Sequence, residues 1–209
     1  MPGTIPTRHQ FWRVFSVGRT SSSLGELAAV AGLEASVATE MSLDGEAWLE
    51  SATEMQGMQS FFEKRGWRVM DDVRAELIAA PVAGTASDPA THRLYLRYAA
   101  EAASLAELDR WYAEEHEQML LRSTAWCRIR RFRTGDPSQP GRLVVHEVSD
   151  PRVLDSVELR AAMSTPWRDS LASKSWFHLS PRQAWRVLAA QPAAKPTQFT
   201  SQNPRSEQM

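Results

Sequence analysis

The chain has 209 residues, which is enough for one large domain or two small ones. Hydrophobic residues make up 43% of it and charged residues 23%, the balance of a globular protein with a sizeable core. The 24 basic and 25 acidic residues nearly cancel, so the composition gives no sign of nucleic-acid binding or of attraction to an anionic membrane.

A single cysteine, Cys127, excludes an internal disulfide and favours a reducing compartment. Residues 1–10 contain no apolar signal core, and no run approaches the roughly 18 apolar residues of a membrane span. We therefore expect a cytoplasmic protein with no membrane partner. Eight tryptophans are many for this length. Most are expected to fill the core, and some can line an apolar ligand pocket.

Residues 1–82 give a blurred succession of strands and helices. The elements predicted there are a strand over 10–17, a short helix over 23–32, an ambiguous strand over 34–41, a helix over 46–64 and a strand over 67–80. Asp44 is placed to cap the second helix and Gly66 to end it. The first half is therefore interpreted as a degenerate ferredoxin-like module, because the hairpin in the middle of such a module is missing or unclear.

A stretch rich in Pro, Gly and small residues, 81–91, is the natural linker to a second half over 91–190. Ser104, with Glu107 three residues later, is a capping-box signature for a helix start. The elements predicted in this half are a strand over 93–98, a helix over 105–122, strands over 126–133 and 142–148, a helical segment over 153–163 and a strand over 183–188. This β-α-β-β-α-β order predicts an α+β, ferredoxin-like fold. Residues 191–209 are too polar to order themselves and are expected to be a disordered tail.

The helix over 105–122 carries the main candidates for chemistry. On a helical wheel one stripe contains Leu105, Leu108, Tyr112, His116 and Met119, with Trp111 and Glu115 at its edge. His116 is therefore predicted to point inward, one turn after Tyr112, so that the two side chains can share a ligand. Burial disfavours the charged imidazolium, and a neutral imidazole can act as a general base. The alternative is a core histidine held by a backbone carbonyl.

Three residues outside this helix are further candidates. His146 shares a strand face with Val144 and Val148 and can approach His116 across the sheet, although a structural histidine is the simpler interpretation. Arg131 is the arginine of the basic strand expected to reach inward as a clamp for a carboxylate or phenolate. The alternatives for that strand are a hydrated edge or nucleic-acid binding, and the neutral net charge disfavours the latter. Trp167 can roof a pocket or simply fill the core. No two histidines have ligand spacing with Cys, Asp or Glu, so no metal site is predicted.

Several of these segments resemble the EthD-like family of dimeric α+β barrel proteins. The segment 111–116 (WYAEEH) is similar to the Trp-Tyr…His segment of the first helix in that family, and weaker similarities lie at 130–132 (RRF), 146–147 (HE) and 164–168 (STPWR). The match covers about residues 92–188. The first half has no Trp-Tyr…His segment, which departs from a tandem repeat of two active modules, so any active site is expected in the second half or between the halves.

The resemblance implies a fold, an activity and partners. One sheet face packs under two helices, and the other packs on a second sheet, usually from a partner subunit, to close a barrel. The implied activity is that of a cofactor-independent lyase or isomerase acting on a small aromatic, polyketide-like or lactone substrate. In it His116 is the acid and base, Tyr112 assists, and the substrate meets Trp111, Glu115, Arg131, His146 and Trp167. A non-catalytic ligand-binding or stress-response barrel and a cofactor-free monooxygenase are the alternatives. The barrel can close within one chain or across subunits, and a homodimer is favoured.

Overall fold

The computed structural model describes residues 8–17, 21–38, 44–83, 89–135, 138–178 and 184–188. Its eight strands are β1 (Arg8–Val17), β2 (Glu34–Ala38), β3 (Asp44–Ser51), β4 (Arg68–Ala79), β5 (His92–Ala99), β6 (Trp126–Thr134), β7 (Gly141–Val148) and β8 (Ala184–Leu188). Its helical segments are α1 (Ser21–Ala31), α2 (Met58–Glu63), α3 (Ala102–Trp111), η1 (Tyr112–His116), α4 (Glu117–Leu120), η2 (Pro151–Asp155), α5 (Val157–Ala162), α6 (Pro166–Ala172) and η3 (Ser175–His178). The tail predicted over 191–209 lies outside the described residues.

The strands form one closed barrel in the order β1-β3-β2-β8-β5-β7-β6-β4, and all their pairings are antiparallel. The first four strands are ordered β4-β1-β3-β2 and the last four β8-β5-β7-β6, so both halves repeat one ferredoxin-like order. Two seams, β2 with β8 and β4 with β6, join the halves. The predicted α+β, ferredoxin-like barrel is confirmed, and the barrel closes within one chain.

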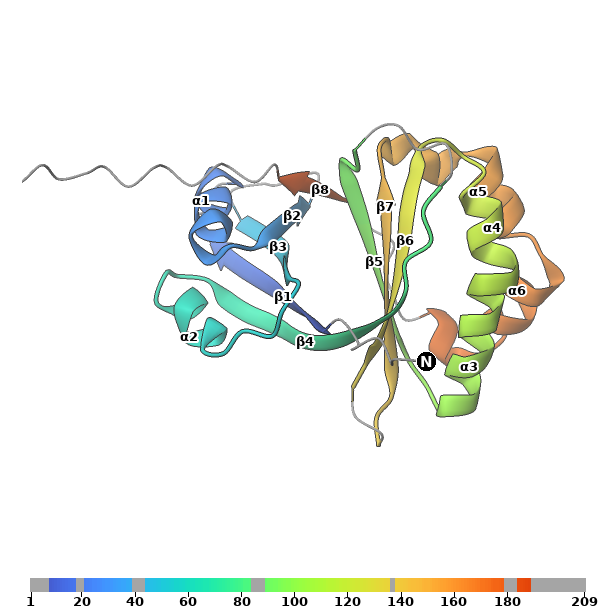
Figure 1. The fold of residues 1–209 in the computed structure, drawn as a ribbon, viewed down its shortest axis with the longest axis horizontal. Helices are drawn as coiled ribbons and strands as arrows, with labels where there is room; N and C mark the ends of the chain where they lie inside the picture. The colour runs from blue at the N-terminus through green and yellow to red at the C-terminus, as the bar shows by residue number, and fades with distance from the viewer. Residues whose placement is uncertain are drawn as a thin grey trace, which may run out of the picture.

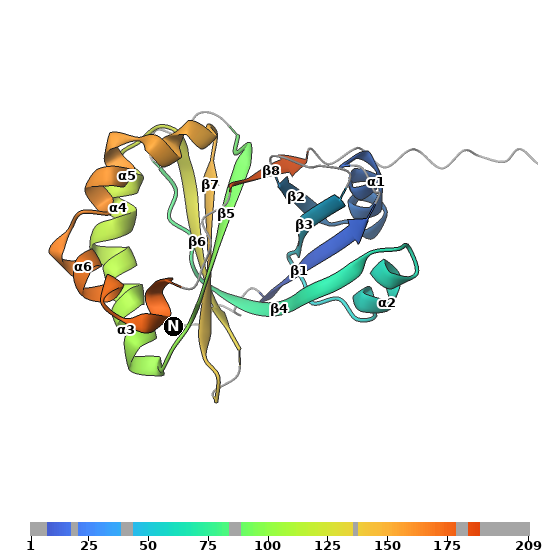
Figure 2. The same cartoon turned by 180° about the vertical axis from the view of Figure 1, so that it is seen from behind.

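The helices cover the two outer faces of this barrel. Helices α1 and α2 lie outside the first four strands, and α3 to α6 lie outside the last four (Figure 1). The view from behind shows the same arrangement, with the two sheets facing each other across the barrel (Figure 2). Because two seams join the halves around a common interior, the division into domains at 1–82 and 91–190 stays a prediction, as does the homodimer.

The helix predicted over 46–64 is wrong. Strand β3 occupies Asp44–Ser51, and only Met58–Glu63 is helical. Glu, Ala and Leu favour helices intrinsically, which misled the sequence interpretation. Here both faces of the strand are covered. Leu49 packs under the helices and Trp48 packs inside the barrel, so polar residues do not alternate along the strand. The middle hairpin β2–β3 is therefore present, and the first half is reduced in its helices.

The predicted start of the second-half helix is also wrong. Helix α3 begins at Ala102, and its N-cap is Glu101. Ser104 lies inside the first turn, where its hydroxyl donates to the Glu101 carboxylate at 3.4 Å. The helical segment predicted over 153–163 is divided between η2 and α5 at Ser156, whose side chain accepts from the Leu159 amide and caps α5.

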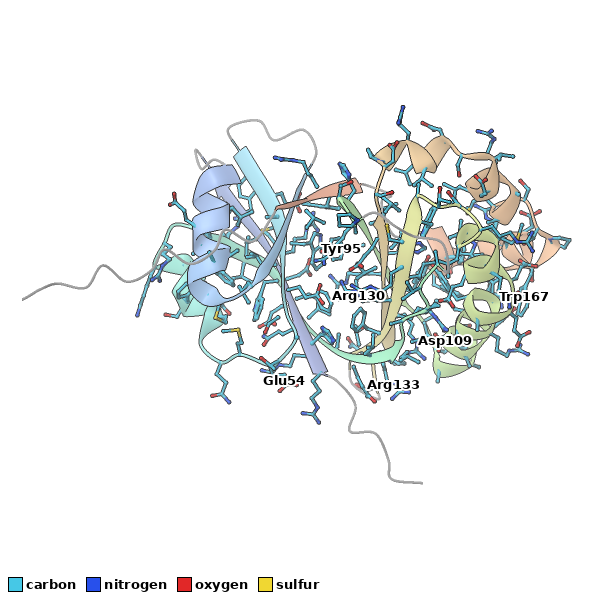
Figure 3. The ribbon with its side chains drawn as sticks, turned by 45° about the horizontal axis from the view of Figure 1, so that its top comes forward. Glu54, Tyr95, Asp109, Arg130, Arg133 and Trp167 are labelled. Carbon is cyan, nitrogen blue, oxygen red and sulfur yellow. The ribbon has the colours of Figure 1, made fainter. Side chains whose placement is uncertain are left out.

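Buried charges join the two halves inside the barrel. Glu50 of β3 accepts from His9 at 3.0 Å and from Arg93 at 3.3 Å. Arg130 of β6 grips the same carboxylate with both terminal nitrogens, one of them at 2.8 Å, and also lies 2.9 Å from Glu147. Arg130 points into the space between the two sheets (Figure 3). All five side chains are at most one-tenth exposed, and buried ions are tolerated only when they are paired in this way. We call these five residues the barrel ion cluster.

The charge on Glu50 is held by its cationic neighbours. Burial alone raises the pKa of this carboxyl, but hydrogen bonds from His9 and Arg130 and the positive charges of Arg130 and Arg93 outweigh burial and lower the pKa to about 2. A carboxyl with a lowered pKa stabilises the fold above its unfolded pKa, near 4.5, and loses that contribution as the pH falls towards 2.

We predict that Glu50→Gln lowers the free energy of unfolding by about 3–5 kcal/mol, because two buried guanidinium groups are left with Glu147 as their one carboxylate in the barrel ion cluster. Urea unfolding at pH 7 measures the change. Glu76→Gln is the matched control, because Glu76 pairs with Arg133 on the exposed surface, where an ion pair contributes at most about 1 kcal/mol. Equal stability losses in the two variants would contradict a special role for the barrel ion cluster.

We further predict that the stability difference between wild type and Glu50→Gln is constant above about pH 5 and shrinks between pH 4.5 and 2. The reason is that acid neutralises Glu50 in the wild type and makes it resemble the variant. Unfolding curves over this pH range provide the measurement, and a difference that does not narrow would show that the pKa of Glu50 is not lowered.

Candidate active site

One continuous helical rod, α3–η1–α4, lies over the outer face of β5, β6 and β7. Its middle turn, Tyr112–His116, is π-helical, and the amide of Glu117 donates to the carbonyl of Tyr112. The Gln118 side chain donates to the Ala113 carbonyl at 3.2 Å within this widened turn. Single π-helical turns inside α-helices occur frequently at functional sites, and this one contains both predicted catalytic residues.

His116 points toward the sheet and is only 4% exposed, so its predicted inward orientation is confirmed. Its ring stacks on Trp111 with centroids 4.1 Å apart and meets the edge of Tyr112 at 5.2 Å. The imidazole is therefore held between two aromatic rings of its own helix. This packing limits the rotation of the ring and gives it a largely nonpolar environment.

His146 approaches from the sheet. It lies on β7, is 2% exposed, and its ring centroid is 6.3 Å from that of His116. The Tyr112 hydroxyl is 3.4 Å from His146 Nε2 and 3.4 Å from the hydroxyl of Tyr98 on β5. The indole N–H of Trp126 on β6 donates to His146 Nδ1 at 3.2 Å. A chain of polar contacts thus runs Trp126–His146–Tyr112–Tyr98 through an apolar layer.

The indole fixes the proton on His146. An indole nitrogen can only donate, so Nδ1 must be the acceptor and the proton of a neutral ring is on Nε2. The Nε2–H then faces the Tyr112 oxygen, which leaves the Tyr112 hydroxyl proton to point to Tyr98 or into the neighbouring space. This assignment follows from the identity of the partner and makes Tyr112 a hydrogen-bond donor toward the interior.

A small cavity of about 40 Å³ lies between the sheet and the helices at this point. Its lining includes Tyr98, Trp111, Tyr112, His116, Trp126 and His146, and is otherwise formed by Leu94, Leu96, Leu154, Leu159, Met163 and Phe177. Such a volume holds about one to three water molecules, whereas typical ligand pockets measure roughly 300–1,000 Å³. A substrate of aromatic size therefore needs the helix-side residues to move.

The other predicted binding residues do not line this cavity. The Glu115 carboxylate accepts from the Trp111 indole at 2.9 Å and from the Thr165 hydroxyl at 2.5 Å. Trp167 lies at the outer edge of the helical layer (Figure 3), with the Arg110 guanidinium 5.9 Å from the centre of its ring. The contacts of these two residues support the helices, and their roles toward a substrate stay predictions.

The side chain of Arg131 is buried, as predicted, but its guanidinium pairs with carboxylates of this chain, those of Glu117 and Asp109. Its Nε donates to Glu117 at 2.7 Å and a terminal nitrogen donates to the Asp109 carbonyl at 3.1 Å. Burial raises the pKa of Glu117, although Arg131 opposes this effect. The guanidinium lies 6.0 Å from the centre of the Tyr112 ring and does not line the cavity. Its role as a substrate clamp stays a prediction.

Sequence reasoning missed Trp126 and Tyr98. Tyr98 could have been found, because it follows Leu94 and Leu96 at a spacing of two residues and so lies on the same, helix-facing side of β5. Trp126 could not, because the register of β6 shifts between Trp126 and Arg128, and this bulge breaks the alternation that would place its ring.

Two further features are absent from the described ranges. No cluster of three or more His, Cys, Asp or Glu side chains there is arranged to hold a metal. None of the helices in those ranges is long and apolar enough to cross a membrane.

The chain is similar to known proteins in its fold and not in its sequence. No family model matches it, and no curated protein matches it. Among solved structures it is similar to chlorite dismutase from Candidatus Nitrospira defluvii in complex with imidazole, with 12% identity and a TM-score of 0.60 over 90% of this chain and 93% of that one. An anthrone oxidase-like protein gives 7% and 0.56 over 90% and 97%. A Listeria monocytogenes ferredoxin fold protein related to antibiotic biosynthesis monooxygenases gives 9% and 0.53 over 88% and 96%.

The chain has the ferredoxin-like α+β barrel fold. The similarity to each of these proteins extends over nearly the whole of both chains, so it includes both halves of the barrel. At identities of 7–12% it establishes the fold alone, because one fold supports many chemistries.

We predict that His146 is the Nε2–H tautomer at neutral pH, and that Trp126→Phe lets the Nδ1–H form appear, because the donor to Nδ1 is lost. Nitrogen chemical shifts of labelled histidine measure the two forms. Trp12→Phe is the matched control, since Trp12 is equally buried in the first half and its indole N–H finds no acceptor among the described residues. An Nδ1–H tautomer in the wild type would contradict the assignment.

Proposed function

We propose that the protein is an enzyme that moves protons on a small organic molecule without a cofactor, as a lyase or isomerase. The observation that carries the proposal is the convergence of His116, His146, Tyr112 and Tyr98 in an otherwise apolar layer. Buried polar groups cost free energy, and titratable groups gathered in such places are candidates for function.

In the proposed reaction His116 removes a proton from a carbon next to a carbonyl group. Tyr112 donates its hydroxyl hydrogen bond to the carbonyl oxygen as negative charge develops there. His146 donates from Nε2 to the Tyr112 oxygen, which orients the tyrosine proton toward the substrate. An isomerase returns the proton from His116 to another carbon. A dehydratase expels a hydroxyl group from the neighbouring carbon, and that group takes the proton from His116 and leaves as water. A decarboxylase instead starts with loss of carbon dioxide from a substrate carboxylate, and protonated His116 gives its proton to the carbanion that remains. Trp111 stacks on His116 and holds its ring in position.

The favoured substrates are aromatic, polyketide-like or lactone compounds with one carbonyl group. The cavity lining is apolar except for the four converging groups, which suits a molecule of this kind. Access requires movement of Leu159 and Met163 of the α5 segment, both only partly buried. Methionine adapts readily to new shapes. The proposed roles of Glu115 and Trp167 are to support this helical cover.

We predict that His116→Gln lowers kcat by about 10²–10⁴-fold, the usual contribution of a general base, and that Tyr112→Phe lowers it by a smaller factor with the fold intact. Turnover is measured on anthrone, an aromatic β-keto acid and a δ-lactone. His92→Gln is the matched control, since His92 is at the end of β5 far from Tyr98 and its ring is hydrogen-bonded to the Thr91 hydroxyl. Full activity in His116→Gln on a turned-over compound would remove His116 from the mechanism.

A cofactor-free oxidase or monooxygenase is the second candidate. It is supported by the similarity of the fold to an anthrone oxidase-like protein and to a protein related to antibiotic biosynthesis monooxygenases. It shares the first step, removal of a proton from carbon. The resulting carbanion reduces O₂, so that a CH₂ group becomes a carbonyl group and one molecule of water forms. Consumption of one O₂ per anthrone would select this candidate, and turnover under nitrogen would select the lyase or isomerase. Binding of all three compounds without turnover would select the non-catalytic ligand-binding barrel.

A further inference from the structure

A second and much larger cavity lies inside the barrel. It measures about 840 Å³ and is lined by residues of seven strands and of the β6–β7 connection, including Gly135, Gln139 and Pro140. It is on the opposite sheet face from His116, because Tyr95 and Arg97 of β5 point into the barrel while Leu94 and Leu96 face the helices. Tyr98 borders both cavities, but none of the residues predicted from the sequence as site residues lines this one.

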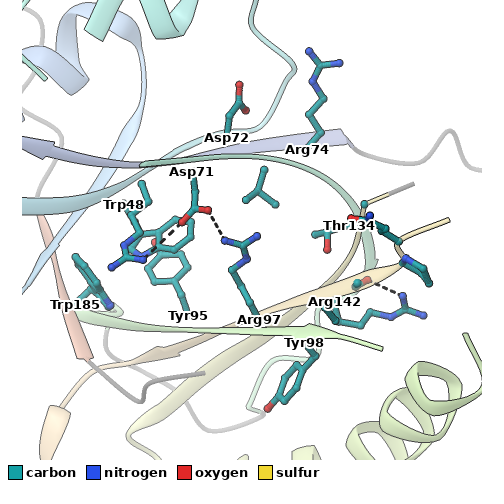
Figure 4. A pocket seen from close by; sticks show the side chains of 17 residues that line it. Trp48, Asp71, Asp72, Arg74, Tyr95, Arg97, Tyr98, Thr134, Arg142 and Trp185 are labelled. Atoms are coloured by element: carbon teal, nitrogen blue, oxygen red, sulfur yellow. Dashed lines mark hydrogen bonds and ion pairs between the residues drawn. The ribbon is translucent and has the colours of Figure 1, made fainter. Parts of the chain in front are cut away.

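One wall of this cavity is aromatic. Trp48 of β3 and Tyr95 of β5 stack with their ring centroids 4.7 Å apart and their planes at 12°. Trp185 of β8 meets Tyr95 edge-on at 6.5 Å. The three rings lie together at one side of the cavity (Figure 4). Aromatic walls of this kind bind flat apolar rings by stacking and by edge-to-face contact.

Two guanidinium groups also line the cavity. Arg97 donates to Asp71 at 2.7 Å, and Arg13 approaches the other oxygen of the same carboxylate at 3.8 Å. Asp71 and Arg97 meet across the cavity beside the aromatic wall (Figure 4). Arg13 also pairs with Glu46, outside the lining. The arrangement shows that a carboxylate fits between the two guanidinium groups.

The other charged residues of the lining do not direct their charged groups into the cavity. Arg74 and Asp72 point away from the cavity (Figure 4). Arg142 is held by Asp109 at 2.7 Å. Within the lining, two arginines therefore face a single aspartate, and Glu46, the second carboxylate that pairs with Arg13, lies outside it. The side chain of Arg97 is 49% exposed, so an entering anion can reach its guanidinium.

We infer that the barrel cavity binds a planar aromatic carboxylate. The ring lies against Trp48, Tyr95 and Trp185, and the carboxylate binds Arg97 and Arg13 in competition with Asp71. The volume is within the range of small-molecule sites. Arginine forks match carboxylates in shape as well as in charge. This site is separate from the His116 site and does not rest on the proposed function.

Titration calorimetry with 2-naphthoate tests the inference. We expect binding to the wild type, about tenfold or more weaker binding to Arg97→Gln and to Arg13→Gln, and unchanged binding to Arg133→Gln. Arg133 is the matched control, because it is as exposed as Arg97 and is also paired with one carboxylate, but it lies outside the cavity. Circular dichroism verifies that each variant is folded.

Two further measurements test whether the carboxylate of the ligand contributes to binding and whether the ligand binds in this cavity or at the His116 site. Replacing 2-naphthoate by the neutral 2-naphthalenemethanol should weaken binding by a similar factor, and His116→Gln should leave naphthoate binding unchanged. The inference is overturned if naphthoate does not bind, if Arg97→Gln and Arg13→Gln bind it as the wild type does, if the alcohol binds equally well, or if His116→Gln abolishes binding. None of these outcomes depends on whether the His116 site is catalytic.

Discussion

The carboxylate of Glu50 is the constraint on which the barrel depends. It comes from the first half of the chain and binds Arg93 and Arg130 from the second, all three buried. A buried ion is tolerated only with its partners in place, so the cluster ties the strands of the first half to those of the second. Strand β7 connects the barrel ion cluster to the outer site, because it carries Glu147 of the cluster and His146 of the site. Glu147 points into the barrel and its neighbour His146 points out toward the helices, so the pairing that holds one residue also orients the other.

The outer site combines several unusual features at one place. The π-helical turn interrupts an otherwise regular helix where Tyr112 and His116 occur. A bulge in β6 interrupts the pairing where Trp126 turns to His146. Each irregularity replaces the regular pattern of backbone hydrogen bonds at its position. Local departures of this kind accumulate where a structure positions chemical groups.

Much of the second half was predictable from its residues, because its strands are rich in aromatic and β-branched residues between turn signals and its long helix has a strong 3.6-residue period. The inward direction of His116 follows from that period alone. The first half was less predictable, since strand 44–51 contains helix-favouring residues and has both faces covered. Closure of the barrel and the partners of Glu50 depend on contacts between residues more than 40 positions apart, as with His9 and Arg130. No local pattern encodes such contacts.

Strand β5 separates the two cavities and serves both of them. Its even-numbered side chains from Leu94 to Tyr98 face the helices, and Tyr95 and Arg97 face the barrel. Moving this strand by a single residue against β7 would exchange the two sets, placing a guanidinium among leucines and apolar side chains among charges. The register of this one strand therefore decides which side chains line each of the two cavities.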